Sequence, residues 1–153
     1  MMVINKEKYL SKILLEVYDS ANWLFNDERW NGSEENFLKL LNENEIILAC
    51  NDTNVVGFLS YFETSGYAVI SGLYVKKENQ KAGIASALIE NLIDNLSAKI
   101  VFAEVMVNAL WARSFYEKYK FELVSKQYEL PSELKSFVGH NDWSFVYKLD
   151  KKC

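Results

Sequence analysis

The most informative stretch of the chain reads Leu73-Tyr74-Val75-Lys76-Lys77-Glu78-Asn79-Gln80-Lys81-Ala82-Gly83-Ile84-Ala85-Ser86. A predicted strand over 67–76 ends here, a polar loop follows, and an amphipathic helix starts near Ala82. The first N–H groups of a helix have no partner within it and lie at the positive end of its dipole, so an anion fits there. Small side chains around Gly83 would let a pyrophosphate approach the backbone. The segment predicts an anion-binding turn, although a plain tight turn has the same pattern.

The sequence on either side of this turn alternates between helical and strand-like patterns. These predict helices over 6–23 and from Ser33 onward, strands over 45–51, 55–63 and 67–76, a helix over 82–96, a strand over 100–107, a helix over 109–119, and strands over 121–127 and 143–149. The stretch 100–107 is apolar apart from Glu104, which indicates a central strand covered on both faces. The order predicts an α/β (α+β) sandwich built on a mixed sheet.

Composition limits the classes of function. The chain has 153 residues, of which 50% are hydrophobic, and a net charge of −4, so we expect a single domain over 1–153 and no nucleic-acid partner. Its apolar runs are too short for a membrane span. Two cysteines and one histidine do not suffice for a disulfide framework or a zinc site, so we expect a cytoplasmic protein without a metal.

Two blocks of sequence resemble motifs of the GNAT superfamily of N-acetyltransferases. The first, Gln80-Lys81-Ala82-Gly83-Ile84-Ala85, is similar to the family's Gln/Arg-x-x-Gly-x-Gly/Ala signature. The second, Asn108-Ala109-Leu110-Trp111-Ala112-Arg113-Ser114-Phe115-Tyr116-Glu117-Lys118-Tyr119-Lys120-Phe121, looks like its Asn-x-x-Ala-x-x-Phe-Tyr-Glu-Lys-x-Gly-Phe element. The resemblance implies a GNAT-like fold, with a central mixed, mostly antiparallel sheet and helices on both faces.

The chain departs from the family pattern at three positions. Ala85 stands where Gly is common, and Asn108 lies one residue before the family's Asn. Lys120 occupies the position of a helix-terminating Gly, where a left-handed backbone would cost about 1 kcal/mol.

The resemblance also implies acetyl-CoA as co-substrate, in a cleft between the strands that end at Val75 and near Val107. The backbone of Leu73–Val75 would bind the pantetheine arm and stabilise the oxyanion. N–H groups of 80–85 would hold the pyrophosphate. The cofactor-binding residues implied are Leu73, Tyr74, Val75, Gln80, Lys81, Ala82, Gly83, Ile84, Ala85, Ser86, Asn108 and Ala112.

Tyr116 is the candidate general acid and Glu104 the candidate base. A phenol with a pKa of about 10 can protonate a thiolate leaving group, whose thiol has a pKa of about 8.5. The alternative is that Tyr116 is an aromatic core residue. Glu104 is expected as a buried carboxylate on its strand, with a structural partner as the alternative. Glu63 is a weaker candidate, and His140 fits a loop better than a base.

These observations predict an enzyme that moves an acetyl group from acetyl-CoA to a primary amine by direct attack in a ternary complex. The alternatives are a non-catalytic acyl-CoA-binding or sensor module with the same fold, and an interaction domain that uses its aromatic surface. The acceptor is a small-molecule or peptide amine, and a homodimer is left open.

Overall fold

The computed structural model describes residues 2–5, 43–52, 54–64, 66–80, 82–106, 110–124, 130–132 and 144–151. The helices predicted over 6–23 and from Ser33 lie outside these residues, as does His140. The elements in chain order are β1 (Met2–Asn5), β2 (Glu45–Asn51), β3 (Asn54–Thr64), β4 (Tyr67–Val75), the 3-10 helix η3 (Lys77–Asn79), α3 (Ile84–Asn95), β5 (Ile100–Met106), α4 (Leu110–Lys118), β6 (Glu122–Leu123) and β7 (Ser144–Asp150).

The strands are hydrogen-bonded in the order β1-β2-β3-β4-β5-β7-β6. The pairs β1–β2, β2–β3, β5–β7 and β6–β7 are antiparallel. Strand β4 pairs in parallel with β5, Tyr67–Ile70 lying against Ile100–Ala103. The mixed, mostly antiparallel sheet is therefore confirmed. Five of the predicted strands agree with β2, β3, β4, β5 and β7 to within one residue at each end.

Two differences from the prediction concern short strands. Strand β1 was not predicted; it pairs with β2, Met2 lying opposite Cys50. Only Glu122–Leu123 form a strand in the stretch predicted over 121–127, of which residues 125–127 lie outside the description. The positions of these two short strands depend on their pairing with β2 and β7, because neither strand has a recognisable sequence pattern of its own.

The chain forms two compact units. The first contains Met1–Phe62 and Ser71–Leu96, and the second contains Glu63–Ile70 and Ser97–Cys153. Strands β3 and β4 contribute to both. None of the helices that the structure describes is long and apolar enough to cross a membrane.

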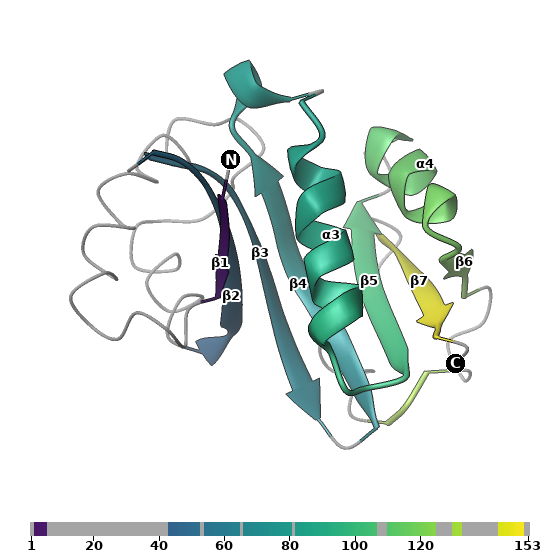
Figure 1. The fold of residues 1–153 in the computed structure, drawn as a ribbon. Coiled ribbons are helices and arrows are strands. Elements are labelled where there is room, and N and C mark those ends of the chain that lie inside the picture. Colours follow the sequence, from purple (N-terminus) through teal and green to yellow (C-terminus); the bar gives the residue numbers. More distant parts are fainter. Residues whose placement is uncertain are drawn as a thin grey trace. The chain divides into compact units, whose positions relative to one another are not determined.

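The first unit is built around β2, β3, the end of β4 and α3. Figure 1 shows β4 leading through η3 into α3, which runs back in the opposite direction. The predicted apolar stripe of α3 is buried, with Ile84, Leu88, Ile89 and Leu92 almost inaccessible. The periodicity therefore identified the face of α3 that belongs to the core.

The second unit contains β5, α4, β6 and β7. Val101, Ala103 and Val105 alternate along β5 and are buried. Residues opposite one another in an antiparallel pair lie on the same face, so Ala103 and its partner Tyr147 on β7 share a face. The side chain of Tyr147 is fully buried, and it is the largest among the fully buried side chains of the described residues.

Candidate functional site

The end of β4 is held by hydrogen bonds on two sides. The N–H of Lys76 donates to the carbonyl of Val56 on β3, at 2.8 Å. The side-chain amide of Gln80 donates to the carbonyl of Val75, at 3.3 Å. Leu73 and Tyr74 are half-buried, whereas Val75 is buried. The backbone predicted to bind pantetheine is thus fixed to β3 and to the turn that follows it.

Gly57 on β3 allows the start of α3 to come close to this strand end. A Cβ atom at Gly57 would lie 2.9 Å from the carbonyl oxygen of Tyr74 and 3.2 Å from Cγ2 of Ile84. Both distances are shorter than ordinary van der Waals contact, so a side chain here would move the strand or the helix. The missing side chain therefore sets the spacing between β3, β4 and the first residue of α3.

The turn before α3 has the geometry of an open helix N-terminus. Gly83 is the N-cap residue, with φ of 78°, and no side chain caps the helix. The first hydrogen bond of the helix runs from the N–H of Ala87 to the carbonyl of Gly83, at 3.0 Å. A Cβ atom at Gly83 would meet nothing within 4 Å, so the backbone is accessible. The first turn also contains no acidic side chain that would repel an anion.

The residues around Gly83 are as small and accessible as predicted. Ala82 is exposed, and Ala85 and Ser86 are half-buried. Lys81 lies outside the described residues, as does Asn108 of the second block. The structure therefore brings Leu73–Val75, Gln80 and 82–86 together within the first unit.

Tyr116 lies on α4 in a cluster of aromatic rings. It is 4% exposed, and its ring centroid is 5.1 Å from Phe121, 5.5 Å from Phe115 and 6.4 Å from Tyr147. Ala112, one turn earlier on the same helix, is also buried. Tyr116 therefore contributes to the packing of the second unit, and its role as general acid stays a prediction.

Tyr147 fixes α4 on β7 and was not among the predicted residues. Its hydroxyl accepts a hydrogen bond from Nε of Arg113 at 3.1 Å and donates one to Oε1 of Glu117 at 3.2 Å. The bond to Tyr147 raises the pKa of Arg113, with the charge of Glu117 acting in the same direction. No local motif marks Tyr147; its only signal in the sequence is a place in the predicted last strand.

The C-terminus of α4 is closed by Lys120 in a left-handed conformation, with φ of 71°. The N–H of Phe121 donates to the carbonyl of Tyr116 at 3.1 Å, and the N–H of Lys120 donates to that of Glu117 at 3.0 Å. These two bonds define a Schellman motif, and the ring contact between Tyr116 and Phe121 is the apolar contact that accompanies it. The left-handed backbone predicted for Lys120 is confirmed.

The expectation that Glu104 is a buried carboxylate was wrong. Its side chain is exposed, although Phe102 and Val105 on the same strand are buried. The covering of β5 on this face therefore does not extend over Glu104. Exposure leaves the carboxylate accessible to water and substrate, and its role as base stays a prediction.

The carboxylate of Glu63 is engaged in hydrogen bonds within the protein, and the thiol of Cys50 is buried. Oε1 of Glu63 accepts hydrogen bonds from the hydroxyl of Ser97 at 2.9 Å and from the N–H of Ala98 at 3.1 Å. Burial raises the pKa of the Cys50 thiol, so it stays protonated at neutral pH. Within the described parts of the chain, no group of three His, Cys, Asp or Glu side chains is placed to hold a metal ion.

Comparisons with known proteins agree with this arrangement. A sequence model of the acetyltransferase (GNAT) family matches residues 13–121. An acetyltransferase of the GNAT family from Staphylococcus aureus Mu50 has a similar structure, with a TM-score of 0.72, 18% identity and coverage of 99% of this chain and 99% of that chain. The ribosomal-protein-S18-alanine N-acetyltransferase from Escherichia coli has a TM-score of 0.72 and 18% identity, with 99% of this chain and 96% of that chain covered.

A third structure, of a GNAT family acetyltransferase from Elizabethkingia anophelis, has acetyl-CoA bound. Its TM-score is 0.60 and its identity 17%, with 78% of this chain and 84% of that chain covered. No curated protein matches the chain. Identities this low show a shared fold, whereas the family match spans well over half of the chain and includes both Gly83 and Tyr116. The chain therefore belongs to the acetyltransferase (GNAT) family.

Proposed function

We propose that the protein transfers an acetyl group from acetyl-CoA to a primary amine. The observation that carries the proposal is the family match over 13–121, together with the open N-terminus of α3 at Gly83 inside the matched region. The acetyl-CoA bound to the Elizabethkingia anophelis relative supports the donor. The alanine N-acetyltransferase from Escherichia coli supports an amine as the acceptor.

Acetyl-CoA binds at the end of β4 and the start of α3 in this proposal. The pyrophosphate accepts hydrogen bonds from the N–H groups of the Gly83 turn, where the helix dipole favours negative charge. The pantetheine arm pairs with the backbone of Leu73–Val75 as an added strand would. Lys81, Asn108 and Ala112 complete the proposed cofactor contacts.

The reaction needs two proton transfers. The amine nitrogen attacks the thioester carbonyl and forms a tetrahedral intermediate, whose oxyanion accepts a hydrogen bond from a backbone N–H of Leu73–Val75. Glu104, directly or through water, takes a proton from the nitrogen. The C–S bond then breaks, and Tyr116 donates its proton to the departing CoA thiolate. The products are the amide and the CoA thiol.

The test is release of the CoA thiol from acetyl-CoA with spermidine, L-lysine or a peptide with an N-terminal alanine as acceptor. We expect at least one amine to be acetylated, with the amide identified by mass spectrometry. Binding of CoA without acetylation of any amine would favour the non-catalytic acyl-CoA-binding module. Absence of CoA binding would favour an interaction domain instead.

A further inference from the structure

A polar cluster lies on the first unit, two residues before the Leu73–Val75 segment. Oγ of Ser71 on β4 is 2.9 Å from Oδ1 of Asn44 and 2.9 Å from Oγ of Ser60 on β3. Ser60 is 0% exposed, Asn44 is half-buried and Ser71 is exposed. We call these three residues the Ser71 cluster, which connects the interior of the unit with the surface of β4.

The hydroxyl proton of Ser71 is already engaged inside the cluster. A hydroxyl carries a single proton, so Ser71 donates only one of its two hydrogen bonds, to Asn44 or to Ser60, and its oxygen accepts the other. The oxygen of Ser71 has two lone pairs, and the described residues use one of them. Its exposed side therefore offers an acceptor, which suits a ligand that brings an N–H donor.

The cluster lies on the face of β3 opposite to α3. The side-chain direction of Gly57 points toward Ile84 of α3. Pairing with β2 is regular from Gly57, opposite Ala49, to Ser60, opposite Ile46. Side chains alternate along a strand, so Ser60 points to the other face. A cofactor held at the start of α3 thus leaves the side of Ser71 to a second substrate.

An aromatic ring flanks the cluster. The rings of Phe58 and Tyr74 lie with centroids 5.2 Å apart. A Cβ atom at Gly72 would lie 2.9 Å from Oγ of Ser60 and 2.9 Å from the ring of Tyr74, so hydroxyl and ring meet across this glycine. Aromatic faces attract cations. A hydrogen-bond acceptor beside a half-buried tyrosine is suited to an ammonium group.

We infer that the Ser71 cluster binds the amine acceptor, with Oγ of Ser71 accepting an N–H of the substrate beside the ring of Tyr74. This inference rests on the proposed function. Ser71 lies two residues from Leu73, about 7 Å along an extended strand. An acceptor held there reaches the acetyl group at the Leu73–Val75 backbone from the side away from α3.

The test compares kinetics of variants with the best amine among spermidine, L-lysine and the alanine peptide. Ser71→Ala is expected to raise the KM for the amine about tenfold, the size of a lost hydrogen bond to a charged donor, and to leave the Kd for CoA unchanged. Ser71→Thr keeps the hydroxyl and is expected to stay near wild type. Asn44→Asp adds a carboxylate beside the ammonium and is expected to lower the KM.

Ser97→Ala is the matched control, because it removes a hydroxyl hydrogen-bonded to Glu63 in the second unit. An unchanged KM in Ser71→Ala, with active wild type, would overturn this inference and leave the proposed function standing. A loss of CoA affinity equal to the rise in KM would also overturn it, because the cluster would then act on the cofactor. No acetylation of any of the three amines would overturn the proposed function and this inference with it.

Discussion

Gly83 has both a left-handed backbone and open space around it, so a side chain added there would meet no neighbouring atom within 4 Å. Gly83→Glu is expected to weaken CoA binding at least tenfold, because it places a carboxylate where the pyrophosphate would lie. The positive φ should also lower the free energy of unfolding by about 1 kcal/mol. Isothermal titration calorimetry with CoA measures the first effect and urea unfolding the second.

Two control variants separate the effect of the added negative charge from the effect of a side chain on a left-handed backbone. Gly83→Ala has the same unfavourable φ without the charge and should retain most of the CoA affinity. Gly66→Glu combines the added charge with an unfavourable backbone, since Gly66 has φ of 92° and no neighbour within 4 Å. Gly66 precedes the other end of β4, so this variant should leave CoA binding unchanged. If folded Gly83→Glu binds CoA as tightly as wild type, the pyrophosphate site is not at this turn.

Tyr116→Phe removes a buried hydroxyl and keeps the ring that packs on Phe121 and Tyr147. We expect kcat to fall about 10²-fold, a typical contribution of a general acid, with little change in acetyl-CoA affinity. Steady-state kinetics measure the effect, and Tyr119→Phe, whose ring also contacts Phe115, is the control. An unchanged kcat, with the chemical step rate-limiting, would leave Tyr116 as a core residue only.

The exposed carboxylate of Glu104 predicts a change in pH dependence. A primary amine attacks only after it has lost its proton, so the rate should rise with pH over the range in which the bound amine is deprotonated. Glu104→Gln should flatten or displace this rise and leave acetyl-CoA binding intact. Glu122→Gln changes another exposed carboxylate, on β6, and should not. Identical profiles for wild type and Glu104→Gln would exclude Glu104 as the base.

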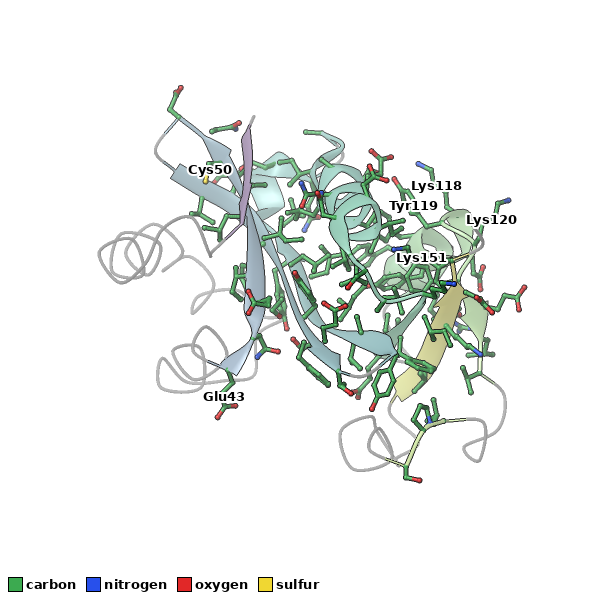
Figure 2. All side chains as sticks on the ribbon, turned by 60° about the horizontal axis from the view of Figure 1, so that its bottom comes forward. Glu43, Cys50, Lys118, Tyr119, Lys120 and Lys151 are labelled. Carbon is green, nitrogen blue, oxygen red and sulfur yellow. The ribbon has the colours of Figure 1, made fainter. Side chains whose placement is uncertain are left out.

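Among the elements, α4 ends in a Schellman motif whose left-handed position is occupied by Lys120, a residue for which this backbone conformation is unfavourable. Lys118 and Lys120 extend outward from this end of the helix (Figure 2). Lys120→Gly should raise the free energy of unfolding by about 1 kcal/mol, because glycine adopts the left-handed Schellman position without steric cost. Lys118→Gly, at the last residue of the helix, should lower it, by at most about 1 kcal/mol. Urea unfolding measures both, and equal effects of the two would contradict the assignment.

Elements with a strong period were predictable from sequence. The stripe of α3 follows from its apolar spacing. The left-handed backbone of Lys120 followed from the resemblance, because Lys120 stands where the family motif has a helix-terminating Gly. Strand β1 could not be predicted, since four residues carry too short a pattern and its place depends on β2, far away in the chain. The exposure of Glu104 and the role of Tyr147 were missed for the same reason: packing partners from distant segments decide them.

At the scale of the whole molecule, net charge limits the acceptor. The chain has a net charge of −4, and its only guanidinium groups are Arg29 and Arg113, the latter engaged with Tyr147. We expect spermidine to be acetylated in preference to an acidic peptide, and its KM to rise with salt as surface attraction is screened. Competition between the two acceptors at low and high salt measures this. A preference for the acidic peptide would contradict the charge argument.

Gly57 shows how a position can matter to a ligand that it never touches. A methyl group there would press on the carbonyl of Tyr74 and on the first residue of α3, which are parts of the proposed thioester and pyrophosphate sites. The two halves of the cofactor site thus share one steric constraint in the middle of β3. Substitutions in the thioester part or in the pyrophosphate part of the site are therefore compatible with the other part only while residue 57 is a glycine. A mutational scan scored by CoA binding would show Gly57 to be as sensitive as residues that contact the cofactor.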